Sequence, residues 1–336
     1  ENSTDFAILL YWKRELSYET EALSEKLESF RILAFRALQT SMAIYCGRAC
    51  GPAELVKYSQ PLFQAKRDNV RRESRVFLPR ENEKDVNRNS YRLQLGTWKK
   101  LLDQDQFLDT LSAGSDMYLA KGCTTAQEGW VADPNWFPLM GEALKRRTLK
   151  LRLVLYPLGQ DISLEEYGRV FPDVPSGTPL DEEGKLVMGA TKLSADGSIQ
   201  AYTGFLSQPY HKTPEGKPGY VGYPSNDLKW LRQRIIDLHS NGHQIAVHCN
   251  GDAAIDAALD AYEEAQRQSP RGDTRFIVIH SQMARPDQIE RMSRLEAIPS
   301  FFITHTYFWG DRHYAIFMGP ERAVRMSPAG DALRCN

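Results

Sequence analysis

From residue 97 onward, short apolar segments alternate with stretches of helical periodicity, and this alternation limits the chain to a parallel α/β fold. Strands are predicted at 151–157, 186–196, 244–252, 275–282 and 298–307, and helices at 98–120, 226–242, 253–268 and 285–297. Short loops between β-branched strands and helices are typical of βαβ units, whose parallel strands are buried on both faces. About five or six such units in series favour a (β/α) barrel of the TIM type over an open sheet. No G-x-G-x-x-G follows a strand, which weakens a dinucleotide-binding alternative.

Residues 1–95 differ from the rest in texture. They are rich in charge, and apolar residues at helical spacing between Leu16 and Ala49 predict one or two helices. We therefore divide the chain into a divergent, partly helical region of unknown role at 1–95 and a barrel segment at 96–336.

The charge balance argues for a small-molecule substrate. Lys and Arg number 42 against 43 Asp and Glu, so no net field favours nucleic acid or an anionic membrane as a partner. No stretch approaches the ~20 apolar residues of a membrane span. The five cysteines are odd in number and sparse, which favours a reducing, cytoplasmic location. Assembly into a homo-oligomer stays open.

Two histidines give the best signal for a site. His248 ends one predicted strand and His280 ends the next, with one helix between them. Both imidazoles should therefore lie at the carboxyl ends of adjacent parallel strands, where barrel enzymes place catalysis. A single histidine there is more often a structural hydrogen-bonding group, but two in register favour a shared metal such as zinc.

Lys192 is the second signal, because a lysine inside an apolar strand is costly to bury unless its charge is lost or paired. A desolvated amine can act as a nucleophile, or it can react with CO2 to form a carbamate that binds metal. A lysine that extends to the barrel mouth is an equal alternative.

Several motifs resemble amidohydrolase family 3, and within it the N-substituted formamide deformylases. They are GCTTAQEG (122–129), KLSADGSIQAYTGFL (192–206), IAVHCNGDAAIDAALDAYE (245–263), VIHSQ (278–282), and ITHT (303–306) followed by GPERAVRMSP (319–328). The likeness covers roughly 120–330.

The resemblance implies a TIM-like barrel and a divalent metal cofactor of one or two ions, zinc first among them. The family's ligands are an H-x-H on the first strand, a lysine on the fourth, single histidines on the fifth and sixth, and an aspartate on the eighth. Carried onto this chain, the metal ligands are Lys192, His248 and His280. Asp196 and His305 match recurrent positions near the substrate, and we take them as candidate catalytic residues.

The sequence also departs from the family pattern. It contains no H-x-H, and it ends at Asn336, before a strand that could carry the aspartate. The expected barrel is therefore incomplete, with its first and eighth strands in doubt.

Three functions remain open. The first is metal-dependent hydrolysis of carbon–nitrogen bonds outside peptides, such as amides or formamides, by metal-activated water. The second is a catalytically inactive or truncated barrel that acts as a binding or vestigial protein. The third is a barrel enzyme that uses Lys192 as a Schiff-base nucleophile.

The remaining histidines and Asp252 are expected to have structural roles. Asp252 could orient the loop after the fifth strand, but capping of the following helix is favoured. His239 and His243 are expected at the surface, and His211 and His313 in loops without partners.

Overall fold

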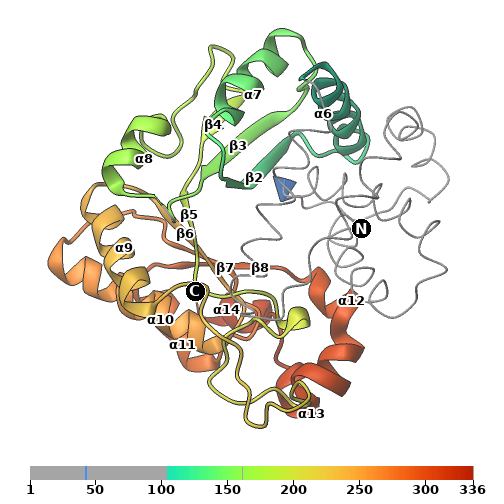
Figure 1. Ribbon diagram of the computed structural model, residues 1–336, viewed down its shortest axis with the longest axis vertical. Helices are drawn as coiled ribbons and strands as arrows, with labels where there is room; N and C mark the ends of the chain where they lie inside the picture. Colours follow the sequence, from blue (N-terminus) through green and yellow to red (C-terminus); the bar gives the residue numbers. More distant parts are fainter. Residues whose placement is uncertain (1–41, 44–103, 161, 336) are drawn as a thin grey trace.

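The computed structural model describes residues 42–43, 104–160 and 162–335, in which helices and strands alternate along the chain (Figure 1). The strands are β1 Met42–Ala43, β2 Thr125–Val131, β3 Arg152–Pro157, β4 Leu186–Met188, β5 Thr191–Ser194, β6 Ile245–Cys249, β7 Ile277–His280 and β8 Ile298–Phe301. The helices are α6 Gln104–Leu119, α7 Trp136–Lys145, α8 Leu164–Val170, α9 Leu228–Ser240, α10 Asp252–Gln268, α11 Pro286–Arg294, α12 Thr304–Arg312, α13 Gly319–Ala323 and α14 Ala329–Arg334, with a 3-10 turn at Ile199–Ala201 and a π-helix at His313–Phe317. The helices predicted between Leu16 and Ala49 lie outside the described residues, apart from 42–43.

The strands form two four-stranded sheets, in the orders β1-β2-β3-β4 and β5-β6-β7-β8. Every pairing is parallel except that of β1 with β2. Sequential parallel order with a helix between neighbours is the βαβ pattern that the sequence predicts, so the parallel α/β class is confirmed. Within the described ranges, no hydrogen-bonded ladder joins β8 to β2.

The two sheets meet where β4 passes into β5. The predicted strand 186–196 is broken at Gly189, whose N–H donates to the Leu155 carbonyl at 2.8 Å. A β-carbon at Gly189 would overlap the ring of Tyr156, so only glycine allows this approach. Beyond the break, Leu158 pairs with Lys192 in a parallel bridge that links β3 to β5.

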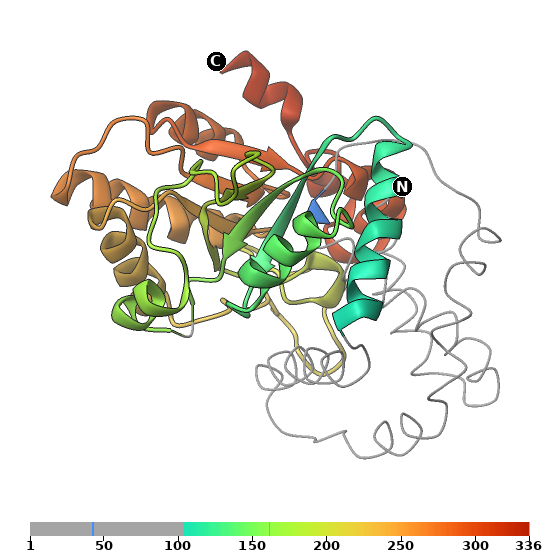
Figure 2. The ribbon, with the colours of Figure 1, turned by 90° about the horizontal axis from the view of Figure 1, so that it is seen from above.

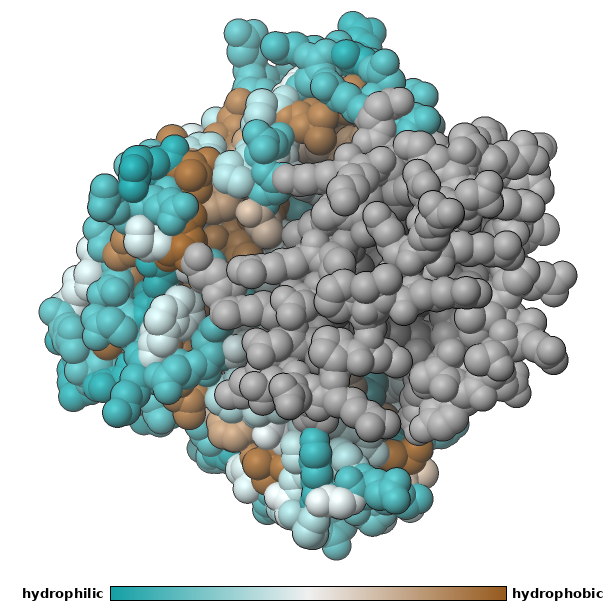
Figure 3. Space-filling view, viewed as in Figure 1, coloured by the Kyte–Doolittle hydropathy of each residue, from teal (hydrophilic) through white to brown (hydrophobic). Residues whose placement is uncertain are grey.

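Helices cover the outer face of the strands. In Figure 1, α9, α10 and α11 lie on one side of β5–β8, and one apolar core joins these helices to β5, β6 and β7. A second core joins α6, α7 and α8 to β2, β3 and β4. The view from above in Figure 2 shows the helices set outside the strands. In Figure 3, hydrophilic residues form most of the outer rim of the described part, and hydrophobic ones gather further inward.

A small third group of buried residues marks the inner face of the strands. Tyr156, Ala190 and Ala246 pack there with the partly buried Ile277 and Ile279. Because side chains alternate between faces, this group identifies which strand residues point inward.

The outer core holds one buried carboxyl group. Glu128 of β2 pairs in register with Leu155 of β3, which packs in the second core, so both side chains point to the helix side. Glu128 is 3% exposed; its Oε1 accepts the Trp130 N–H at 3.0 Å, and its Oε2 has no hydrogen-bond partner among the described residues. Burial raises the pKa of Glu128 to about 8.

Two details differ from the sequence expectations. The last predicted strand, 298–307, ends at Phe301, and α12 begins at Thr304. The helix predicted at 226–242 begins at Leu228 and is capped by Asp227, whose Oδ1 accepts the N–H groups of Lys229 and Trp230. No helix in the described ranges is long and apolar enough to span a membrane.

Candidate metal and catalytic site

His248 and His280 lie together at the carboxyl ends of β6 and β7. The register pairs His248 with Ile279 and Cys249 with His280. The centroids of the two imidazole rings are 4.6 Å apart, and their planes meet at 78°. The structure therefore brings together the two histidines that the sequence singles out.

The orientation of His280 depends on an unusual backbone. Its register partner Cys249 packs in the outer core, so strand alternation alone would direct His280 to the helix side. His280 and the following Ser281 instead have φ of +70° and +43°. Such values are uncommon for residues other than glycine, and they accompany the turn of this ring toward His248.

Lys192 lies beside the two histidines on β5. It pairs with Ala246, which belongs to the inner group, and Ser194 pairs with His248, so Lys192 and His248 share the inner face. Lys192 is 4% exposed, and burial lowers its pKa to about 7. Near neutral pH a substantial share of this amine is thus uncharged and nucleophilic.

Asp196 holds the loop that follows β6. Its Oδ1 accepts the Asn250 N–H at 2.9 Å and faces His248 Nδ1 at 3.2 Å. Its Oδ2 accepts the N–H groups of Gly251 at 2.7 Å and Phe205 at 2.9 Å. Burial raises the pKa of Asp196 to about 7, against the three backbone donors that favour the charged form. The carboxylate therefore orients His248 and fixes the loop.

Gly251 is required for this arrangement. A β-carbon there would overlap the carbonyl group of Phe205, which lies against the loop after β6. The close approach of the two loops delivers both N–H groups to Asp196.

His305 joins the site from α12 and not from a strand as predicted. Its ring centroid is 5.7 Å from that of His280 and 4.4 Å from that of Phe302. The side chain is buried, and its Nδ1 has no hydrogen-bond partner among the described residues. Burial lowers the pKa of His305 well below its usual range, so the ring is neutral.

The site favours neutral imidazoles throughout. Burial, reinforced by the positive charge of Lys192, lowers the pKa of His248 to about 3. Burial lowers the pKa of His280 well below its usual range, with smaller contributions from His248 and Lys192. Neutral imidazole is the form that binds metal ions.

The donor atoms fit part of a metal site. A His248 tautomer that donates from Nδ1 to Asp196 leaves its Nε2 as an acceptor, which here receives a hydrogen bond from Asn250 Nδ2 at 3.3 Å. A carboxylate that accepts from a histidine in this way is the usual support of a metal-binding imidazole. His280 Nδ1 is buried without a hydrogen-bond partner in the described ranges. In those same ranges, no three His, Cys, Asp or Glu side chains form a ready metal-binding group.

A second polar cluster was missed by the sequence analysis. His313, expected in a loop, is fully buried in the π-helix, and burial lowers its pKa to about 4. Its Nε2 lies 3.0 Å from Gln200 Nε2 and 3.3 Å from Gln282 Nε2. No local sequence pattern signals this cluster, because Gln200 and Gln282 lie far from His313 in the chain.

His239 is also buried, contrary to the expectation of a surface position. Its Nε2 contacts the Ser269 carbonyl at 2.8 Å, and its ring lies edge-on to Tyr262. This histidine is a satisfied hydrogen-bonding group remote from the site.

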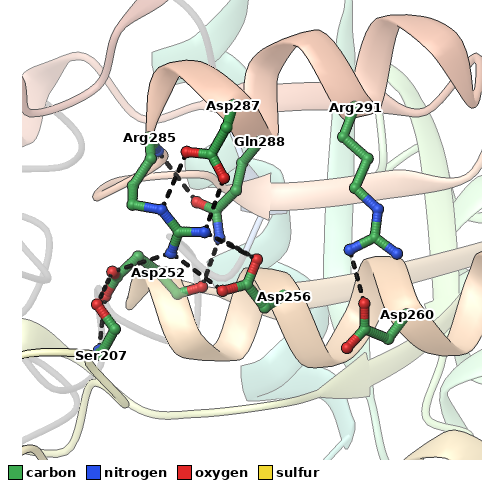
Figure 4. Close-up of polar contacts among 8 residues, drawn as sticks. All are labelled: Ser207, Asp252, Asp256, Asp260, Arg285, Asp287, Gln288 and Arg291. Carbon is green, nitrogen blue, oxygen red and sulfur yellow. Dashed lines mark hydrogen bonds and ion pairs between the residues drawn. The ribbon is translucent and has the colours of Figure 1, made fainter.

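Asp252 does not cap α10. Gly251 occupies the N-cap position, and Asp252 is the first helical residue. Its carboxylate accepts hydrogen bonds from the Ser207 N–H at 2.9 Å, from the Ser207 hydroxyl, and from Arg285 Nη1 at 3.1 Å (Figure 4). Of the two roles considered for Asp252, the structure supports orientation of the loop after β6.

Comparison with known proteins agrees with this architecture. A model of the amidohydrolase family matches residues 82–335. Over 237 residues the chain is 26% identical to the protein LONG AFTER FAR-RED 3 of Arabidopsis thaliana, covering 68% of this chain and 39% of that protein. Over 198 residues it is 29% identical to an N-substituted formamide deformylase of Arthrobacter pascens, covering 57% of this chain and 34% of that enzyme.

A solved structure shares the fold. An uncharacterized metal-dependent hydrolase from Pyrococcus horikoshii OT3 superimposes with a TM-score of 0.58 at 20% identity, over 73% of this chain and 46% of that one. The chain thus spans less than half the length of these two relatives and of this structure.

Proposed function

The chain belongs to the amidohydrolase family, and from that premise we propose that its protein hydrolyses a carbon–nitrogen bond outside peptides, such as an amide or formamide, with a divalent metal. The observation that carries the proposal is the meeting of two neutral imidazoles, at the carboxyl ends of β6 and β7, with a desolvated lysine on the inner face of the adjacent β5. The deformylase relative adds the class of bond, and the metal-dependent relative of known structure adds the cofactor.

His248, His280 and Lys192 are the residues that would hold the metal. His248 offers Nε2 because Asp196 takes its Nδ1–H, and His280 offers its unpartnered Nδ1. Lys192 would contribute as a carbamate, because CO2 reacts with the uncharged amine that burial favours. When bound, a zinc or similar ion supplies Lewis acidity, which activates water near neutral pH and polarises a carbonyl group.

The remaining groups act on substrate and water. His305 is neutral and presents a buried ring to the His280 side, so it suits hydrogen bonding to a small, uncharged substrate. Asp196 keeps His248 in one tautomer and one orientation, with support from three backbone N–H groups. Asp196 and His305 therefore serve orientation and substrate binding in this proposal.

The test uses the full chain, stripped of metal and reloaded with zinc, manganese or iron. We expect hydrolysis of amide or formamide substrates and metal bound in stoichiometric amount. H280A should lower the bound metal at least tenfold, whereas H211A, at an exposed histidine outside the site, should leave it unchanged. Loaded protein that hydrolyses no such substrate, with metal content unaffected in H280A, would refute the proposal.

A second candidate rests on the same amine. A lysine with a pKa of about 7 can attack a carbonyl substrate and form a Schiff base. Borohydride reduction in the presence of a carbonyl compound would then attach the substrate to Lys192, and mass spectrometry of the peptide would reveal it. Absence of that adduct, with hydrolysis present, leaves the metal mechanism.

A further inference from the structure

Arg285, at the start of α11, lies at the centre of a charged network beside the site (Figure 4). Its Nη1 donates to Asp252 Oδ2 at 3.1 Å and to Asp256 Oδ2 at 3.0 Å, and its Nη2 donates to Asp256 Oδ1 at 3.1 Å. Its Nε and Nη2 also bind the two carboxylate oxygens of Asp287 at 3.1 and 2.9 Å. One guanidinium thus separates three carboxylates that would otherwise repel one another.

Gln288 extends this network to the backbone. Its Nε2 donates to the Asp252 carbonyl at 2.7 Å, and its Oε1 accepts the Arg285 N–H at 3.0 Å. Asp252 is held in turn from the other side by Ser207, through the N–H and the hydroxyl. Arg285, Gln288 and Asp252 therefore tie the first turn of α11 to the first turn of α10.

These two helix starts are the ends of the loops that carry the imidazoles. Asp252 lies four residues after His248, and Arg285 lies five residues after His280. Both intervening loops are short, so a fixed distance between the helix starts restricts the distance between the rings. The positive φ at His280 and Ser281 adds to the need for support, because such backbone persists only where its surroundings hold it.

Arg291 offers a built-in comparison further along the same helix pair. It links α11 to α10 through Asp260 Oδ1 at 2.6 Å and Glu263 Oε2 at 2.5 Å. Its side chain is 19% exposed against 27% for Arg285, so the two arginines are similarly buried. Both dock α11 on α10, but Arg291 lies more than one turn beyond the loops (Figure 4).

We propose that Arg285 is a positioning residue that sets the separation of the His248 and His280 imidazoles by tying the loop after β6 to the loop after β7. The proposal rests on the proposed function of that site, since the two rings are taken as metal ligands. It predicts that loss of Arg285 disturbs the rings, whereas loss of Arg291 affects only helix docking.

The test compares R285M with R291M in the full chain. Co²⁺ titration followed by absorbance should show binding to R285M about tenfold weaker than to R291M. In metal-free protein, the ring resonances of His248 and His280 should shift in R285M, and amide hydrogen exchange at 281–284 should accelerate. R285K keeps the positive charge but loses the planar guanidinium that binds several carboxylates at once, so its Co²⁺ affinity should lie between those of R285M and the parent.

Equal changes in R285M and R291M would overturn the proposal, because they would reduce Arg285 to helix docking. A folded R285M with unchanged ring resonances of His248 and His280 and unchanged amide hydrogen exchange at 281–284 would overturn it as well. If the parent protein bound no Co²⁺, the proposed function would fail, but the metal-free resonances and exchange rates would still decide on the role of Arg285.

Discussion

Glu128→Gln should stabilise the protein at neutral and higher pH, because it removes a carboxyl group that the fold keeps protonated. Burial raises the pKa of Glu128 from 4.5 to about 8. Between these pH values the unfolded chain releases a proton that the folded protein retains. The free energy of unfolding therefore falls as the pH rises, by about 1.4 kcal/mol per pH unit.

The size of the effect follows from that interval. At pH 7 the free energy of unfolding of the parent is about 3 kcal/mol lower than at acid pH because of this group alone. Glutamine has the shape of the protonated acid and keeps the acceptor for the Trp130 N–H, but it does not titrate. E128Q should thus be as stable as the parent near the pKa that Glu128 has in the unfolded chain. At pH 7 its free energy of unfolding should be about 3 kcal/mol higher, which raises the melting temperature by roughly 6 to 12 °C.

Denaturant unfolding of both proteins from pH 5 to pH 8 measures the difference directly. E290Q is the matched control, because Glu290 is an exposed residue of α11 and the change replaces the same acid by the same amide. The reasoning is refuted if E128Q and the parent show the same pH slope, or if E128Q is the less stable protein at pH 8. The same pH slope would mean that Glu128 is ionised in the folded protein, and a less stable E128Q would mean that the site does not accept an amide in place of the acid.

Two further substitutions test the loops of the site. In D196N the side-chain amide must turn one N–H toward a backbone N–H that Asp196 now accepts. The free energy of unfolding, measured with denaturant, should therefore fall by about 2 kcal/mol, and Co²⁺ should bind more weakly. Unchanged stability would show that the three backbone donors have other acceptors. Ser281 has φ of +43°, and its hydroxyl donates to the Val278 carbonyl at 2.9 Å. Both S281G and S281A lose this hydrogen bond, but only glycine removes the strain of the positive φ. We expect S281G to be the more stable of the pair by about 1 kcal/mol, and the reverse order in unfolding experiments would argue against strain at this position.

The sequence predicted the parallel α/β class because its strands and helices are locally consistent. Short β-branched runs and amphipathic helices mark β3, β6, β7, α10 and α11 within a few residues of their observed bounds. The break between β4 and β5 was not predictable, because it depends on the ring of Tyr156 against Gly189, and these residues are far apart in sequence.

Residues of the site were found to different degrees. Lys192, His248 and His280 were identified from their places on apolar strands, and the structure brings them together. The grouping could be predicted, whereas their role as ligands remains a prediction. The burial of His313 could not be predicted, because a π-helix and a distant partner such as Gln282 leave no local pattern in the sequence. His305 was recognised by resemblance but placed on a strand, since aromatic and β-branched neighbours favour strand in isolation.

The pairing of His248 with His280 shows where strand periodicity stops being informative. His280 ends β7 and His248 is the penultimate residue of β6, and the register places His280 opposite Cys249, one residue beyond His248. Strict alternation would then put the two rings on opposite faces of the sheet. The rings meet only because the chain leaves the strand with positive φ at His280, a conformation that costs about 1 to 3 kcal/mol and needs support from its surroundings. The contacts of Arg285 and Gln288 with Asp252 supply such support from the far end of the loop, so the strained backbone and the charged network are two parts of one arrangement.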